Sequence, residues 1–234
     1  GQIMMTGAKP VSVPLYEEND FKIKAEDIEK AITSKTKAIL LNSPSNPLGS
    51  VLGKKDIVEI AEVVKKYDLI VYSDEVYDRI IYDDVEYFSM AQIPEARDRV
   101  LVINSLSKSF AMTGWRIGYV IGDKKIISNM PKLQEGIASC VPAFIQKAAV
   151  EAITNSQNAV EEMLAHYKRR RDILIDGLNN IPGISCIKSP GSFYAFANIK
   201  AFGKSSIEFA EELVKGAKVL VVPGSAFGTM GEGY

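Results

Sequence analysis

Residues 100–108 read Val100-Leu101-Val102-Ile103-Asn104-Ser105-Leu106-Ser107-Lys108, a continuous apolar run that passes directly into polar residues. A short apolar run of this kind predicts a buried β-strand that ends where the polar residues begin. Two similar runs precede it, at Ala38–Leu41 and Leu69–Tyr72, with a helical pattern over Asp56–Tyr67 between them. Strands separated by helices are typical of a parallel α/β sheet, and continuously apolar strands predict a sheet that is covered on both faces.

The next apolar run, Trp115–Ile121, follows Lys108 too closely for a helical crossover, so we expect it to run antiparallel to the strand before it. That direction returns Arg116 to the edge where the preceding strand ends. The turns after the two earlier strands bring Asn46 and Asp74 to the same edge. Because ligands of open α/β sheets bind beyond the carboxyl ends of the strands, we expect a ligand site there.

The chain changes character beyond Gly122, where a mostly helical tract begins. Pro142 marks a helix boundary in this tract, and a long helix is expected around Ala159–Leu178. A β-rich tail follows, with strand and helix patterns at Ile184–Ile187, Phe193–Phe196, Ser206–Gly216 and Val219–Val222. We predict a three-layer α/β/α large domain with a mostly parallel sheet over residues 1–167 and a partial, smaller α+β domain over residues 168–234.

Composition and charge exclude several classes of protein. Apolar residues make up 47% and charged residues 24% of the 234 residues, which excludes wholesale disorder. The formal net charge of −1 offers no general attraction to nucleic acid or an anionic membrane, and we expect neither partner. The single histidine, His166, argues against a His-based metal cluster or a Ser/His/Asp triad, so we predict no metal site. The distant cysteines Cys140 and Cys186 indicate a reducing compartment, and we expect a cytoplasmic protein.

The polar residues at the predicted sheet edge match what pyridoxal phosphate demands of a protein. The cofactor needs a lysine for a Schiff base, a carboxylate for its pyridine nitrogen, donors to its phenolate oxygen, and hydroxyls with a cation for its phosphate. The residues that could meet these demands are Lys108, Asp74, Tyr77, Asn46, Ser105, Ser107 and Arg116. Each alone also has an ordinary structural interpretation, as a surface charge, a helix cap or a turn residue. Their convergence on one edge favours the functional interpretation.

Residues Ser105–Tyr119 resemble the cofactor-lysine signature of class I and II aminotransferases, which are pyridoxal-phosphate enzymes of the aspartate aminotransferase superfamily with fold type I. Asn42–Gly49 is similar to the family's Asn-Pro-x-Asn-Pro-x-Gly turn, and Ser73–Tyr77 to its Asp-Glu-x-Tyr segment. Pro190–Tyr194 and Val222–Gly228 resemble motifs of the family's small domain. The resemblance covers essentially the whole chain, in the family's order.

The resemblance implies a role for each matching residue. Lys108 would form the Schiff base and then, as a neutral amine, move the proton between Cα of the substrate and C4′ of the cofactor. Asp74 would pair with the pyridinium nitrogen and keep the ring an electron sink. The resemblance implies cofactor contacts from Tyr77 and Asn46 to the phenolate oxygen and from Ser105 and Arg116 to the phosphate, with Ser107 as a weaker phosphate candidate.

The sequence departs from the family's pattern in two ways. Ser43 and Leu48 replace the usual Pro and Thr of the asparagine turn, which leaves Asn46 in place. The family's N-terminal segment has no counterpart, and the arginine that holds the substrate carboxylate normally follows a segment like Gly231–Tyr234. We therefore expect a fragment of a longer, homodimeric enzyme, and we expect the fragment alone to bind the cofactor weakly or not at all.

The predicted function is amino-group transfer between an amino acid and a 2-oxo acid through Lys108. A pyridoxal-phosphate-dependent C–S β-lyase of the same fold would use the same lysine and aspartate, and a non-catalytic fragment is a further alternative. Gly49–Lys55 faintly suggests a nucleotide phosphate loop, but it has one residue too few between its glycines and lacks Ser or Thr after the lysine. The basic run Lys168–Arg171 is expected to be a solvated helix face.

Overall fold

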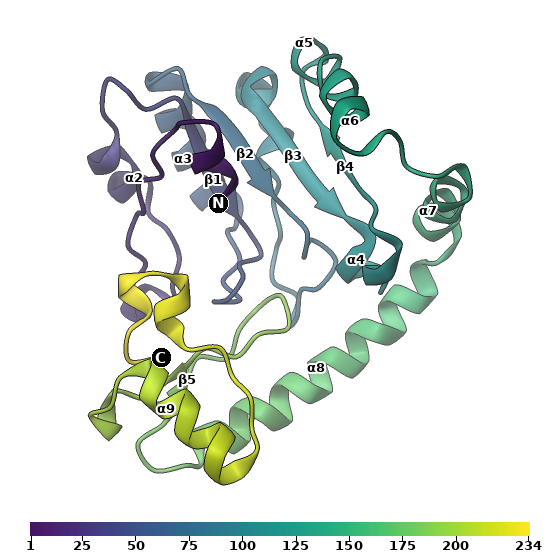
Figure 1. Cartoon of the computed structure of the whole chain (residues 1–234). Helices are drawn as coiled ribbons and strands as arrows, with labels where there is room; N and C mark the ends of the chain where they lie inside the picture. Colours follow the sequence, from purple (N-terminus) through teal and green to yellow (C-terminus); the bar gives the residue numbers. More distant parts are fainter.

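The computed structural model describes residues 1–234 and is shown in Figure 1. Its six strands are β1 (Ala38–Asn42), β2 (Ile70–Asp74), β3 (Val100–Ser105), β4 (Gly118–Ile121), β5 (Ser185–Cys186) and β6 (Ala197–Asn198). Its α-helices are α1 (Gln2–Met5), α2 (Ala25–Ala31), α3 (Lys54–Lys66), α4 (Leu106–Ser109), α5 (Lys124–Ile127), α6 (Met130–Ala138), α7 (Ala143–Asn155), α8 (Gln157–Asn179) and α9 (Ser206–Glu212). Short 3-10 turns and one π-helical turn at Leu213–Ala217 complete the secondary structure.

The first four strands form one sheet in the order β1-β2-β3-β4. β1, β2 and β3 are parallel, and β4 is antiparallel to β3, which confirms the mostly parallel α/β sheet and its antiparallel return. β4 begins at Gly118 rather than at Trp115, because Thr113–Trp115 forms a 3-10 turn and Arg116 adopts a left-handed backbone with a φ of 51°. This turn reverses the chain between α4 and β4 without a crossover helix.

The main core lies between α3 and one face of the sheet. α3 begins after Gly53, whose N–H donates to the carboxylate of Asp56 at 2.9 Å. Apolar residues recur along α3 at helical spacing, so they share one face of the helix. The core residues from α3 and the facing strands are Leu41, Ile57, Ile60, Ala61, Val63, Val64, Val71, Val100 and Val102, all buried. Each fully buried aliphatic side chain of this kind contributes about 1.5–3 kcal/mol, so this contact fixes the strands relative to α3.

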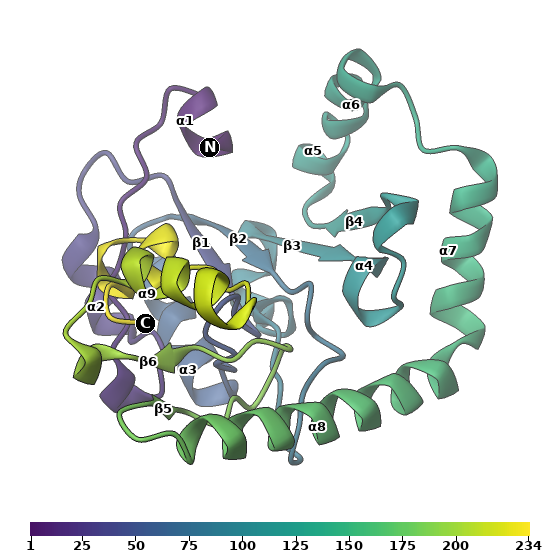
Figure 2. The ribbon, with the colours of Figure 1, turned by 60° about the horizontal axis from the view of Figure 1, so that its bottom comes forward.

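The other face of the sheet is partly open, contrary to the prediction that both faces are covered. Leu40 of β1 lies opposite Tyr72 of β2 in the parallel register, and their exposed fractions are 59% and 40%. Both views of the ribbon place α5, α6 and α7 beyond the β4 edge, and α8 runs below the sheet (Figures 1 and 2). The exposed fractions of Leu40 and Tyr72 show that no helix covers these two side chains fully.

The long helix α8 leads from the sheet to the tail of the chain (Figure 1). α7 begins directly after Pro142, as predicted, and α8 spans Gln157–Asn179. α8 is continuous through residue 167, where the predicted boundary between residues 1–167 and 168–234 lies, and that boundary stays a prediction. None of the helices has the length and apolar composition needed to cross a membrane.

The tail contains less β structure than the sequence predicted. Its only strands are β5 and β6, which pair antiparallel over two residues each. Val219–Val222 does not form a strand, and its side chains are exposed. The reason is that β-propensity needs a neighbouring strand to pair with, and these residues follow the π-helical turn with no strand beside them.

The tail packs instead against a segment near the start of the chain. The ring of Tyr234 stacks on Phe196 with centroids 4.8 Å apart, and Phe21 meets the same two rings edge to face. The Tyr234 hydroxyl donates to the carboxylate of Glu17 at 2.8 Å. These contacts attach residues 17–21 to the β5–β6 region.

Candidate active site

The polar residues that follow the parallel strands do gather at one edge of the sheet. Asn42, the last residue of β1, is in register with Asp74, the last residue of β2. The Asn42 side-chain amide donates to the backbone carbonyl of Asp74 at 3.1 Å. Ser105, the last residue of β3, is in register with Gly118, which places Arg116 just beyond the same edge. The antiparallel β4 therefore returns Arg116 to the edge where β3 ends, as predicted.

Asp74 presents a buried carboxylate oxygen that has no partner. Its Oδ1 is inaccessible to solvent and makes no hydrogen bond. Burial raises the pKa of the Asp74 carboxyl, and a hydrogen bond from the backbone N–H of Val76 opposes this shift. Burial disfavours the charged form of a carboxyl group, whereas a neighbouring positive charge favours it. The geometry therefore offers Asp74 as an acceptor for a cationic or N–H donor from outside the chain.

Glu75, the next residue, contrasts with Asp74 because its buried carboxylate is fully paired. Oε1 accepts hydrogen bonds from Ser73 Oγ at 2.8 Å and Ser89 Oγ at 2.7 Å, and Oε2 accepts from the Tyr87 hydroxyl. Burial, followed by the Glu75 charge, raises the pKa of Tyr87. This network fixes the start of the turn that carries Asp74, and its members were not predicted from the sequence as site residues.

Tyr77 lies at the other end of this turn with its side chain buried. Its hydroxyl oxygen is 2.7 Å from that of Tyr194, a residue that sequence reasoning placed in a motif but not in the site. Burial and then Tyr194 raise the pKa of Tyr77, and the nearby Asn46 side chain opposes this shift. Asn46 is held by its backbone N–H, which donates to Oδ1 of Asn42 at 2.7 Å. Asn46 and Tyr77 thus lie near each other, and their contacts with a cofactor stay a prediction.

Lys108 enters the same region from α4. Its Nζ lies 5.7 Å from the ring centroid of Phe193, within range of a cation–π contact. Phe193 in turn meets the ring of Tyr77 edge to face, with centroids 5.4 Å apart. Phe193 and Tyr194 belong to the segment that resembles a small-domain motif, which was the available signal for their presence at the site. Lys108 and Tyr77 therefore approach one aromatic cluster from different elements.

The three residues predicted to hold a phosphate lie around the start of α4. Ser105 is the N-cap of α4, and its Oγ accepts the Ser107 N–H at 3.1 Å and donates to the Ile117 carbonyl at 3.2 Å. Arg116 is exposed, and its guanidinium donates to the Thr113 carbonyl at 2.9 Å. The Ser105 hydroxyl is therefore engaged in capping, whereas the Arg116 side chain reaches solvent beside it.

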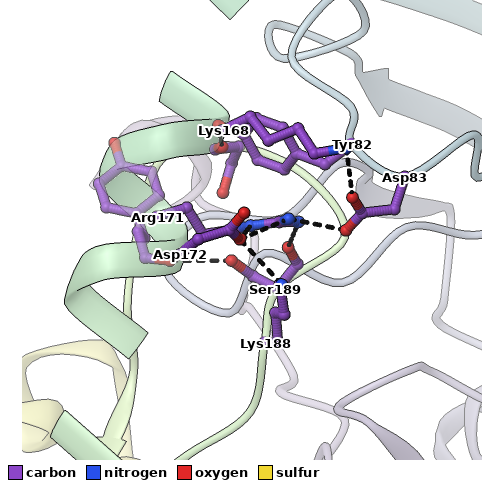
Figure 3. A network of polar contacts seen from close by, with 9 residues as sticks. Tyr82, Asp83, Lys168, Arg171, Asp172, Lys188 and Ser189 are labelled. Atoms are coloured by element: carbon purple, nitrogen blue, oxygen red, sulfur yellow. Dashed lines mark hydrogen bonds and ion pairs between the residues drawn. The ribbon is translucent and has the colours of Figure 1, made fainter. Parts of the chain in front are cut away.

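Arg171 is not part of a solvated helix face, contrary to the prediction for the basic run. The exposed fraction of its side chain is 5%, and its guanidinium lies 4.4 Å from the ring centroid of Tyr82. Figure 3 shows Arg171 between the turn at Asp83 and the loop at Ser189. It donates to the Ser189 carbonyl at 3.0 Å and pairs with Asp83 at 2.7 Å. It is buried because two loops pack on this side of α8.

Two further pairs complete this network (Figure 3). Lys168 pairs with Asp83 at 2.8 Å, and Lys188 pairs with Asp172 at 2.9 Å. The hydrogen bond from Lys168 lowers the pKa of Asp83, and that from Lys188 lowers the pKa of Asp172. The network ties α8 to the loop that leads to Phe193 and Tyr194, so it supports the site from a distance.

The other motifs weighed from the sequence contribute no comparable cluster. No group of three or more His, Cys, Asp and Glu side chains is arranged to hold a metal ion. In the stretch Gly49–Lys55, the Gly53 N–H is occupied by the Asp56 carboxylate, and the Lys54 Nζ lies 5.7 Å from the Phe88 ring. The groups that would face a nucleotide phosphate are thus used within the chain.

Comparison with known proteins decides the family. The family model described as "Aminotransferase class I and II" matches residues 2–233. The chain belongs to this family. Its resemblance to class I and II aminotransferases is thereby confirmed, and enzymes of this class depend on pyridoxal phosphate.

Similar aminotransferases are known in sequence and in structure. The chain is 48% identical over 234 residues to an aspartate aminotransferase of Pyrococcus abyssi and 45% identical to aromatic-amino-acid aminotransferase 2 of Thermococcus litoralis. Each match covers 99% of the chain and 60% of the relative. The crystal structure of an aromatic aminotransferase from Pyrococcus horikoshii OT3 aligns with a TM-score of 0.97 at 46% identity, over 99% of the chain and 62% of that structure. The chain thus spans about three fifths of the length of these aminotransferases.

The donors and acceptors at the sheet edge fit pyridoxal phosphate. The unpaired, buried Oδ1 of Asp74 suits a pyridinium N–H, which would supply the partner that the chain itself does not provide. The paired hydroxyl of Tyr77 and the neighbouring Asn46 suit a phenolate oxygen. An exposed guanidinium at Arg116 suits a phosphate.

Proposed function

We propose that the protein to which these residues belong is a pyridoxal-phosphate-dependent aminotransferase that transfers an amino group from an amino acid to a 2-oxo acid. The observation that carries the proposal is the unpaired, buried carboxylate oxygen of Asp74 at the same sheet edge as Tyr77 and Lys108. A buried carboxylate oxygen without a partner is costly to a folded protein, so we infer a ligand that supplies one. Membership of the aminotransferase family supports the identity of that ligand.

The proposed roles follow from the positions of the side chains. When bound, the cofactor supplies an electron-withdrawing ring that stabilises negative charge at the α-carbon of the substrate. Asp74 would keep the ring nitrogen protonated, and Tyr77 and Asn46 would donate to the phenolate oxygen. Arg116 and Ser107 would hold the phosphate, and Ser105 would join them by turning its hydroxyl proton from the Ile117 carbonyl to the phosphate. Lys108 would anchor the cofactor and carry a proton on Nζ to and from the substrate.

The wider setting is also proposed. We propose a homodimer of the full-length protein on the family resemblance alone. Amino acids and 2-oxo acids are the substrates that the names of the aminotransferase relatives imply. Cytoplasmic location is supported by the two unpaired cysteines, of which Cys140 is exposed and Cys186 is buried. We propose no nucleic-acid or membrane partner, in keeping with the net charge of −1.

Borohydride reduction with pyridoxal phosphate tests this function in the full-length protein that contains residues 1–234. We expect a reduced adduct on the peptide that contains Lys108, found by mass spectrometry, and amino transfer from aspartate or phenylalanine to 2-oxoglutarate. Lys108→Ala should abolish the adduct and lower turnover by at least about 100-fold, because it removes the general base as well as the anchor. Lys54→Ala, which alters a lysine outside the site, is the matched control and should retain both.

Other outcomes of this experiment contradict the proposal. An adduct that maps to a lysine other than Lys108 would show that the assignment of the site is wrong. Release of pyruvate from a cysteine conjugate without consumption of a 2-oxo acid would identify a C–S β-lyase instead.

A further inference from the structure

Tyr194 places a second phenol against the phenol of Tyr77. The two hydroxyl oxygens lie 2.7 Å apart, although the residues are separated by 117 positions in the sequence. Their rings also meet edge to face, with centroids 5.7 Å apart. Tyr194 was not among the residues predicted from the sequence to contact the cofactor.

The loop that carries Tyr194 is anchored to the segments that form the site. The Gly191 N–H donates to the Gly49 carbonyl at 3.0 Å, in the polar turn after β1. The Ser192 N–H donates to the Ile80 carbonyl at 2.8 Å, in the segment after β2. Because both bonds reach the segments that provide site residues, the Tyr194 hydroxyl is fixed relative to them.

The number of phenol protons limits how the pair can be arranged. A phenol hydroxyl has one proton to donate and can also accept, so only one member of a phenol pair donates to the other. If Tyr77 gave its proton to Tyr194, none would remain for an oxygen of a bound ligand. If Tyr194 is the donor, the Tyr77 proton is free to point toward the sheet edge where Asp74 and Lys108 lie.

We propose that Tyr194 donates its hydroxyl proton to Tyr77 and thereby directs the proton of Tyr77 to the phenolate oxygen of pyridoxal phosphate. The inference rests on the proposed function, since the acceptor of the Tyr77 proton is the cofactor. Tyr194 is a positioning residue, because it acts through Tyr77. Its donation also polarises the Tyr77 hydroxyl, and such cooperativity strengthens the next hydrogen bond by about 10–30%.

This strengthening has a spectroscopic consequence. A stronger hydrogen bond to the phenolate oxygen draws negative charge away from the nitrogen that joins Lys108 to the cofactor, so this nitrogen releases its proton at a lower pH. The absorbance of the lysine-bound cofactor reports that protonation. Besides Tyr194, Asp74 on β2 acts on Tyr77, and Tyr82 belongs to the same buried cluster. Lys108 on α4 and Tyr167 on α8 contact Phe193, which packs on Tyr77. A change of Tyr194 to Phe leaves all four in place.

The test measures the pH midpoint of this absorbance change in the full-length protein loaded with pyridoxal phosphate. Tyr194→Phe should raise the midpoint by about a tenth to a third of the rise caused by Tyr77→Phe. The reason is that it removes only the part of the hydrogen bond from Tyr77 to the phenolate oxygen that is due to polarisation by Tyr194. Tyr167→Phe is the matched control, because the Tyr167 ring stacks on Phe193 at 5.3 Å in the same cluster without a hydrogen bond to Tyr77. It should leave the midpoint unchanged.

The possible results separate this inference from the proposed function. An unchanged midpoint in Tyr194→Phe, beside a clear rise in Tyr77→Phe, would overturn the role of Tyr194 and leave the proposed function intact. Equal rises in Tyr194→Phe and Tyr167→Phe would also overturn it, because they would indicate general loosening of the aromatic cluster. If the wild-type protein formed no borohydride-trapped adduct, the proposed function and the inference would both be wrong.

Discussion

Arg171→Ala would remove the buried cation at the centre of the network in Figure 3. Its guanidinium donates to the Ser189 carbonyl at 3.0 Å and lies 4.4 Å from the ring centroid of Tyr82. A hydrogen bond to a charged group is worth about 1.5–3 kcal/mol, and a cation–π contact adds about 0.5–1 kcal/mol. The ion pairs with Asp83 and Asp172 add little, because both carboxylates reach solvent. We therefore expect the free energy of unfolding to fall by about 3 kcal/mol.

Urea denaturation followed by circular dichroism measures this loss. With a slope of about 1–3 kcal/mol per molar urea, the midpoint should fall by roughly 1–3 M. Arg169→Ala is the matched control, because it removes the same charge two residues earlier on α8 from an exposed side chain. Its effect should stay within about 0.5 kcal/mol. Equal losses in the two variants would refute the claim that the buried contacts of Arg171, rather than its charge, stabilise the fold.

The difference in unfolding free energy between wild type and Arg171→Ala should also depend on pH. The pKa values of Asp83 and Asp172 are lowered in the folded protein, first by Lys168 and Lys188 and then by Arg171. A carboxyl group with a lowered pKa stabilises the fold above its unfolded pKa, and this contribution is lost as the pH falls through the folded pKa. The gap in stability between wild type and Arg171→Ala should therefore narrow as the pH drops below about 4. A gap that widens with acidification would contradict the assigned ion pairs.

Two further substitutions test the site itself. Asp74→Asn should lower kcat by a larger factor than it weakens binding of pyridoxal phosphate, because pairing with the ring nitrogen acts mainly in the transition state; equal losses in the two quantities would argue against this role. Ser105→Ala should remove the α4 cap and lower Tm by about 2–4 °C, whereas Ser107→Ala, which leaves the capping hydroxyl in place, should leave Tm unchanged in a thermal melt.

The sequence could predict the sheet edge because its signals are local. Each parallel strand is a short apolar run followed directly by polar residues, and parallel strands place such ends together. The short distance from Lys108 to the next strand also predicted an antiparallel return, which β4 confirms. The strand predicted at Val219–Val222 was wrong because local apolar composition says nothing of whether a partner strand exists.

Tyr194 and Arg171 could not be identified in the same way, since their environments depend on chain folding over long distances. Tyr194 reaches Tyr77 across 117 positions, and no periodicity encodes that contact. Arg171 belongs to a run of four basic residues on α8, and its neighbours Arg169 and Arg170 are exposed. The loops at Asp83 and Ser189, packed against one side of the helix, make position 171 buried.

The adjacent carboxylates Asp74 and Glu75 differ in how many hydrogen-bond partners the fold gives them. Asp74 is the last residue of β2 and Glu75 follows it directly, and both are shielded from solvent to some degree, so their sequence positions hardly distinguish them. Three hydroxyl donors complete Glu75, whereas Oδ1 of Asp74 has none. The fold therefore gives both carboxylate oxygens of Glu75 hydrogen-bond donors, whereas Oδ1 of Asp74, at the end of β2, has no donor. If the cofactor binds as proposed, it would give Asp74 Oδ1 the partner that the fold does not provide, and we therefore expect cofactor binding to stabilise this edge of the sheet.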